Sequence, residues 1–256
     1  MRYQTVLFIG FALFLARGEA RAAQGVLIAT EAIQPQAAID DEGNVYLVFL
    51  HRGNIAVSVS KDRGRSFGKP AVAIDTGGRA QGGLQRGPRI GLDRKKNLYV
   101  TAFVVLDEAE YQKRYPSADL CLVSSADGGR TWTKPVRVNE VPKKAPEALH
   151  WLAVSPSGEV HLAWLDIRER PKGGQDLWYA RVAGGKPGKN LRVASEICNC
   201  CAPGAAVDSS GNPLLAFREG GDGKPSREIY VVRSADRGAK FSKPARVNTK
   251  DSNEAG

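Results

Sequence analysis

The stretch SKDRGRSF, from Ser60 to Phe67, recurs as SADGGRTW from Ser125 to Trp132 and as SADRGAKF from Ser234 to Phe241. Each copy begins with Ser-x-Asp, carries a glycine two residues after the aspartate and ends on an aromatic ring. The aspartate can accept hydrogen bonds from the backbone of its own turn, and the glycine permits the positive φ of a tight hairpin. We therefore expect three hairpin turns of one type. Their aspartates, expected to be structural and not catalytic, are Asp62, Asp127 and Asp236.

A second repeated pattern precedes these turns and divides the chain into four units. Each copy has a short apolar strand, a polar turn of four or five residues and a second apolar strand. The copies are PQAAIDDEGNVYLVF from Pro35, PRIGLDRKKNLYVTA from Pro88, HWLAVSPSGEVHLAW from His150 and PGAAVDSSGNPLLAF from Pro203. They start 53, 62 and 53 residues apart, and the third unit lacks the octapeptide. Repeated four-stranded units of this length are typical of β-propellers.

The octapeptides resemble the Asp box, S-x-D-x-G-x-T-W, of sialidases and related β-propellers. The resemblance implies an all-β propeller domain over residues 23–256, with four-stranded antiparallel blades at roughly 31–80, 85–140, 147–195 and 200–250. Sialidase-type propellers have six blades, which would need about 320 residues at this repeat length. The sequence therefore predicts either four blades that close on themselves or a chain that lacks about two blades.

Composition and the first residues narrow the class of protein. The 28 glycines and 14 prolines favour turns and exclude a coiled coil or a helical bundle. Residues 1–22 have a basic start, an apolar run and an Ala-x-Ala site, which predicts a signal peptide and a secreted or periplasmic protein with no transmembrane span after cleavage. The net charge of +10 is spread along the chain, which favours an acidic glycan as partner over nucleic acid.

Propeller geometry sorts the remaining polar residues onto one face. The first strand of a blade lines the central channel and the four strands alternate in direction. The start of strand one, the end of strand two and the start of strand three therefore meet at one end of the blades, which we call the rim. The residues placed there are Gln36, His51, Arg52, Asn54, Arg89, Asp119, His150, Trp151, Asp166, Arg168, Asp176, Gly204, Arg218, Glu219 and Glu228. An insertion in the second unit adds Glu108, Glu110, Tyr111 and Tyr115.

The sialidase resemblance also implies a chemistry for the rim. Sialidases hold the substrate carboxylate with three arginines and use a tyrosine nucleophile, a glutamate that activates it and an aspartate as acid/base. The substrate-binding residues expected on this basis are Arg89, Arg218, either Arg52 or Arg168, and the neighbouring His150 and Trp151. The catalytic residues expected are Tyr111 or Tyr115 as nucleophile, Glu219 or Glu228 as its base, and Asp166 as acid/base. Two departures are plain, since Pro88-Arg89-Ile90-Gly91 replaces the usual Arg-Ile-Pro and no tyrosine occupies a matching inner strand.

Three cysteines in four residues form a separate motif. Cys198, Cys200 and Cys201 lie just before the first strand of the fourth unit and so reach the same rim, whereas Cys121 lies inside a strand. In an exported protein the three cysteines predict a disulfide, with a soft-metal site completed by His150 or His51 and free thiols as the alternatives.

The function that follows is an exported sialidase-type propeller that recognises, and in its active form hydrolyses, an acidic sugar. No cofactor is required for that chemistry. The alternatives are a non-catalytic carbohydrate- or protein-binding propeller, and a metal-binding propeller that uses the three cysteines.

Overall fold

The computed structural model describes residues 25–80, 82–83, 85–113, 117–170, 174–220 and 228–248, and these residues form four antiparallel sheets. The predicted signal segment, residues 1–22, lies outside them. The first sheet contains β1 (Ala32–Ile39), β2 (Val45–His51), β3 (Asn54–Ser60) and β4 (Ala71–Ile74). The second contains β5 (Arg89–Leu92), β6 (Leu98–Val104), β7 (Asp119–Ser125) and β8 (Val136–Arg137).

The third sheet has five strands, because both a two-residue strand and a longer one pair with its third strand. Its members are β9 (His150–Val154), β10 (Val160–Asp166), β11 (Gln175–Ala183), β12 (Lys186–Pro187) and β13 (Leu191–Ile197). The fourth contains β14 (Gly204–Val207), β15 (Pro213–Arg218), β16 (Ile229–Arg233) and β17 (Ala245–Arg246). In the described part of the chain the only helix is α1 (Glu108–Tyr111), and no helix there is long and apolar enough to cross a membrane.

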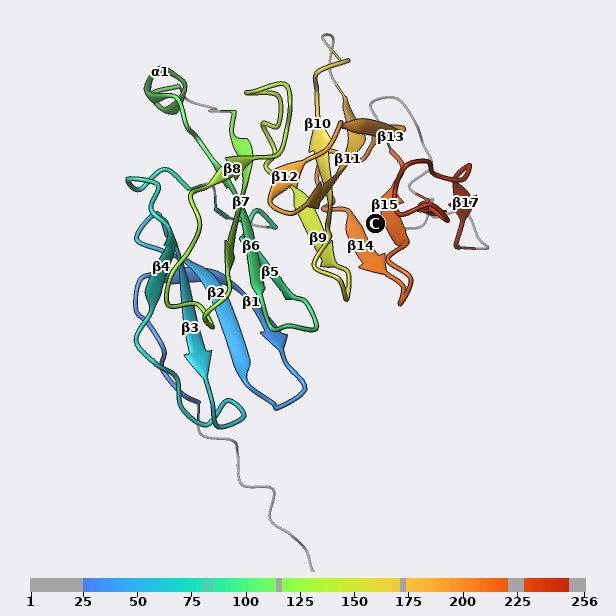
Figure 1. The fold of residues 1–256 in the computed structure, drawn as a ribbon. Coiled ribbons are helices and arrows are strands. Elements are labelled where there is room, and N and C mark those ends of the chain that lie inside the picture. The colour runs from blue at the N-terminus through green and yellow to red at the C-terminus, as the bar shows by residue number, and fades with distance from the viewer. Residues whose placement is uncertain are drawn as a thin grey trace, which may run out of the picture.

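The four sheets stand side by side in chain order, from the blue first sheet to the orange fourth (Figure 1). Their first strands contact one another in the order β1, β5, β9 and β14. These observations confirm the expected all-β architecture of antiparallel blades with inner first strands. No comparable packing joins β14 to β1 within the described residues, so closure of the ring by four blades stays a prediction.

Three apolar layers hold neighbouring blades together. Val48 and Val100 lie in the layer between the first and second blades, and Leu120 and Trp164 lie in the layer between the second and third. Leu177 and Leu215 lie in the layer between the third and fourth blades. Successive side chains of a strand point to opposite faces of the sheet, so a blade that is covered on both faces buries all of them. This explains why every residue of β10 is buried, whereas β1 alternates in exposure.

The octapeptide turns close the hairpins at the end of the blades opposite the rim. Asp127 accepts hydrogen bonds from the backbone nitrogen of Thr131 at 2.9 Å, from its hydroxyl at 2.6 Å and from the Ser125 hydroxyl at 2.8 Å. Asp62 accepts the three equivalent bonds from its own turn, whereas Asp236 accepts two, from the Ser234 hydroxyl and the Lys240 backbone nitrogen. These hydrogen bonds lower the pKa of Asp62 to about 2.

The ring that ends the octapeptide packs against the preceding blade. Phe241 meets the edge of Tyr179 in the third blade, with ring centroids 4.8 Å apart. Trp132 likewise packs against the layer between the first two blades. The third blade lacks the octapeptide and turns from β11 to β12 through Gly184 and Gly185, both at positive φ.

Candidate functional site

The starts of the inner strands bring an arginine and a tryptophan into contact. Arg89 begins β5, and its guanidinium carbon lies 4.6 Å from the ring centroid of Trp151 on β9. Arg89 is only 8% exposed, and its terminal nitrogens donate to the carbonyl oxygens of Gln85 (2.9 Å), Gly87 (3.2 Å) and Pro88 (3.2 Å). Its Nε is buried without a hydrogen-bond partner.

Among the described residues this guanidinium has no counter-ion. No carboxylate lies within ion-pair distance of Arg89 in the described ranges. Burial accordingly lowers the pKa of Arg89. Trp151 is half-buried, and its ring lies against the guanidinium of Arg89.

His150 is the buried neighbour of Trp151 on β9. It is fully buried, its Nε2 lies 3.0 Å from the Thr101 hydroxyl, and its ring meets the edge of Phe103 at 5.2 Å. Burial, followed by the nearby charge of Arg89, lowers the pKa of His150 to about 3. The expectation that His150 contacts the ligand is therefore wrong, because its ring has no exposed surface.

Gln85 joins Arg89 to the turn that carries Cys198, Cys200 and Cys201, here called the cysteine turn. Its backbone oxygen accepts from Arg89, while its side-chain Oε1 accepts from the backbone nitrogen of Ala202 at 3.0 Å. Arg218, at the end of β15, donates from Nη1 to the sulfur of Cys201 at 3.5 Å. The structure thus brings Arg89, Trp151, Arg218 and the cysteine turn together on the rim. Sequence reasoning missed Gln85, because a lone glutamine in a glycine-rich loop carries no signal of its own.

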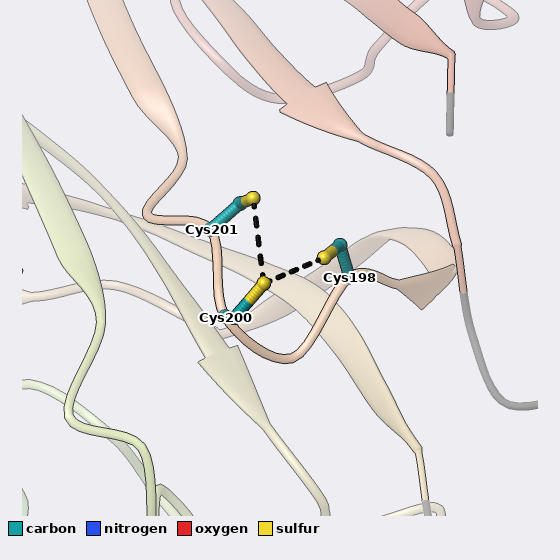
Figure 2. Close-up of side chains that lie close together, drawn as sticks. All are labelled: Cys198, Cys200 and Cys201. Carbon is teal, nitrogen blue, oxygen red and sulfur yellow. Dashed lines mark hydrogen bonds between the residues drawn. The ribbon is translucent and has the colours of Figure 1, made fainter. Parts of the chain in front are cut away.

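The cysteines are free thiols grouped at one point (Figure 2). The sulfur of Cys200 lies 3.2 Å from that of Cys198 and 3.8 Å from that of Cys201. Among the described residues no histidine joins them, so the expected ligation by His150 or His51 is not present. Cys121 is buried in the layer between the first two blades and cannot reach the turn. Cys121 is free and so does not form the expected disulfide with this turn, and the sulfurs of Cys198 and Cys200 are themselves farther apart than the bonded length of about 2.05 Å.

The three sulfurs differ in acidity. Burial opposes ionisation of Cys198, but hydrogen bonds from the Cys200 backbone and from the other two thiols, with the charge of Arg218, lower its pKa overall. The hydrogen bond to Cys198 and then burial raise the pKa of Cys200 to about 11.

Asp166 and Arg168 form a structural pair. Asp166 is fully buried at the end of β10, and its carboxylate accepts from Arg168 Nε (2.9 Å), Nη2 (2.5 Å) and backbone nitrogen (2.7 Å). The guanidinium also lies 4.0 Å from the Trp178 ring centroid. A carboxylate that is sealed and fully paired cannot donate a proton to a ligand, so this placement argues against the predicted acid/base role of Asp166 and the predicted clamp role of Arg168.

Glu228 is fixed in the same way, within a repeated latch. Its carboxylate accepts from Asn248 and lies 3.1 Å from Nε of Arg246. In the second blade Asp119 occupies the same position at the start of strand three and accepts from Asn139 at 2.8 Å. Both asparagines also accept from the backbone of strand three, Asn248 from Ile229 and Asn139 from Leu120. The Arg-Val-Asn sequence that follows the octapeptides of the second and fourth blades is the signal for this latch. The latch argues against Glu228 as a catalytic base.

The other predicted site residues fall into different categories. Tyr111 ends α1, which Figure 1 places at the outer edge of the fold, well away from the inner strands. Tyr115 lies outside the described residues. Arg52 is exposed and paired with Glu31 at 2.6 Å. Glu219 sits beside the cysteine turn, since its residue forms a bridge with Ile197.

Comparison with known proteins agrees with the fold. No protein-family model and no curated protein matches the chain. Among solved structures, an ulvan lyase of polysaccharide lyase family PL25, bound to a GlcA(1-4)Rha3S unit, aligns with a TM-score of 0.60 at 16% identity, over 86% of this chain and 56% of its own. The Hadza microbial sialidase Hz136 aligns with a TM-score of 0.54 at 15% identity, over 84% of this chain and 46% of its own.

An α-L-arabinanase from Penicillium chrysogenum in complex with arabinobiose aligns with a TM-score of 0.57 at 16% identity, over 85% of this chain and 67% of its own. The chain thus spans about half to two thirds of the length of these structures. At such identities the likeness concerns the fold, and it assigns this chain the blade architecture of propeller-type proteins.

Proposed function

We propose that this chain binds an anionic saccharide at the rim, through Arg89, Trp151 and Arg218, and does not hydrolyse it. The observation that carries the proposal is the buried guanidinium of Arg89, which has no carboxylate partner in the part of the chain that the structure describes. A desolvated cation is costly unless an anion approaches it. A carboxylate or sulfate on a sugar supplies that charge.

Trp151 adds a surface suited to a sugar. An indole ring combines a broad apolar face with a polar edge, which is the usual composition of a site for a molecule with both apolar and hydroxyl-bearing surfaces. Arg218 stands on the same rim, and its guanidinium offers the planar fork that matches a carboxylate. The net charge of +10 attracts an anionic ligand over a longer range.

Hydrolysis would require a nucleophile, a base and an acid around one bond. The described residues do not assemble them: Asp166 and Glu228 are held in structural contacts and Tyr111 lies at the outer edge of the fold. Recognition without turnover is the function that this arrangement supports. Two of the structurally similar proteins are a sialidase and a lyase bound to a glucuronate-containing unit, and this supports an anionic sugar as the class of ligand.

Calorimetry with N-acetylneuraminic acid and with a glucuronate-containing disaccharide, against a neutral disaccharide, tests the proposal. Binding should be confined to the anionic sugars. Arg89→Ala should weaken it about 10- to 100-fold, the loss expected for one charge-assisted contact. Arg52→Ala is the matched control, since it removes an exposed rim arginine that is paired with Glu31, and it should leave affinity unchanged.

Two outcomes would overturn the proposal. Equal affinity of Arg89→Ala and the parent protein, both folded by circular dichroism, would remove its basis. Turnover of a fluorogenic sialoside by the purified chain would replace recognition with hydrolysis.

A further inference from the structure

The cysteine turn, which carries Cys198, Cys200 and Cys201, has the arrangement of a metal chelate. The ligand atoms of its three cysteines all lie within 4.8 Å of one another (Figure 2). Within the described ranges no histidine, aspartate, glutamate or fourth cysteine belongs to this group. The site therefore offers three soft donors and no fourth ligand from the chain.

The cysteine turn is fixed to the fold on both sides. The backbone nitrogen of Cys198 donates to the Arg218 carbonyl oxygen at 2.9 Å, and that of Cys201 closes the turn onto the Cys198 carbonyl oxygen at 3.4 Å. One residue later, Ala202 donates to Gln85 of the second blade. Because the backbone is tied at each end, the sulfurs converge before any metal arrives, which reduces the conformational cost of binding.

The donor set discriminates between metals. Structural Zn²⁺ is almost always bound by four protein ligands in a tetrahedron, which three cysteines do not complete. Thiolates select soft ions such as Cu(I). Cu(I) is a soft d10 ion that accepts trigonal coordination by thiolates, so three sulfurs can form a complete shell around it.

Arg218 provides the second layer of the site. Its Nη1 lies 3.5 Å from the sulfur of Cys201, on the side of β15. Three thiolates around one Cu(I) carry a net charge of −2, and the guanidinium offsets part of that charge while orienting one ligand. Cys200 is exposed, which gives an incoming ion access to one sulfur from solvent.

We propose that Cys198, Cys200 and Cys201 bind a single Cu(I) ion in a trigonal thiolate site, with Arg218 as a positioning residue. On binding, each thiol gives up its proton to solvent and forms one Cu–S bond, so no electron is transferred. Arg218 contributes to both the copper site and the proposed sugar site. Cys200→Ser removes a copper ligand without removing a sugar-binding residue, and Arg89→Ala does the reverse, so failure of one proposal is distinguishable from failure of the other.

The test uses the full chain prepared without oxygen and with reduced thiols. Cu(I) is titrated in competition with the chromophoric chelator bicinchoninate, and X-ray absorption reports the ligands. One copper per chain with three sulfur neighbours is expected. Cys200→Ser should abolish stoichiometric binding, and because that position is exposed on a turn, the variant should keep the far-ultraviolet dichroism of the parent.

Two controls separate the site from general thiol chemistry. Cys121→Ala removes a buried cysteine in another layer and should retain one copper. Arg218→Ala should weaken copper about 10- to 100-fold, the usual effect of losing a partner that orients a ligand. Capture of Zn²⁺ in preference to Cu(I), unchanged copper binding by folded Cys200→Ser, or a Cys198–Cys200 disulfide that resists the reductant would each overturn the proposal.

Discussion

The stability contributed by the buried ion pair between Asp166 and Arg168 tests whether Asp166 is a structural residue. The side chain of Asp166 is 0% exposed and that of Arg168 is 7% exposed, and three hydrogen bonds join the residues. Removing one partner of a buried ion pair leaves an uncompensated charge, which costs about 3–5 kcal/mol. Asp166→Ala should therefore lower the free energy of unfolding by about 3–5 kcal/mol.

A double-mutant cycle isolates the interaction. Arg168→Ala should be similarly destabilising, because it leaves the Asp166 carboxylate buried alone. The double variant loses both charges together, so its destabilisation should fall short of the sum by up to about 3 kcal/mol. The matched control is Arg52 with Glu31, whose side chains are each 65% exposed, and for which the coupling should be about 0.2–1 kcal/mol.

Urea unfolding followed by tryptophan fluorescence measures all these variants. A coupling no larger than that of the control pair would refute a structural role for Asp166. So would an Asp166→Ala variant that is as stable as the parent, because removal of a catalytic carboxylate often leaves stability unchanged or raised.

Two further predictions concern stability. In Gly238→Ala the new Cβ would lie 2.6 Å from Cζ of Tyr179 at a backbone φ of +88°, whereas in Gly64→Ala the nearest atom would be 4.0 Å away at φ +83°. Both variants should lose about 1–2 kcal/mol of stability because of the left-handed backbone, and Gly238→Ala should lose about 1–3 kcal/mol more because of overpacking. Equal urea midpoints for the two variants would contradict this. Burial lowers the pKa of His150 to about 3 and that of His161 to about 4, so below pH 6.5 the unfolded chain binds more protons than the folded one. The contribution of these two histidines to the free energy of unfolding is thus full above pH 6.5 and should fall as the pH drops towards 5, by up to about 1.4 kcal/mol per pH unit for each histidine. In urea unfolding at several pH values, His161→Phe should show about half of that dependence on pH. An unchanged dependence would contradict the lowered pKa of His161.

The repeats made the blade architecture predictable from sequence. Spacing of apolar strands and of Ser-x-Asp turns depends on local backbone chemistry, which the residues of each turn carry within themselves. The strands that begin at Arg89, His150 and Gly204 follow from that pattern, and all three are inner strands in the structure. The rim was predictable for the same reason, because consecutive antiparallel strands bring the start of strand one, the end of strand two and the start of strand three to the same end of a blade.

Only the tertiary structure separated structural from ligand-facing residues on that rim. Asp166, Glu228 and His150 have the residue types of an active site, but burial and neighbours from other strands determine what each does. Glu228 is bound by Asn248, twenty residues later, and His150 by Thr101 of another blade. The first contact needs β16 and β17 to pair within one sheet, and the second needs two blades to pack. The solvation and charge of each side chain therefore depend on atoms distant in sequence. By itself the sequence determined the repeating hairpins and the spacing of the cysteines. Tertiary packing decided that Arg89 has no carboxylate partner among the described residues and that the three sulfurs lie within 4.8 Å of one another.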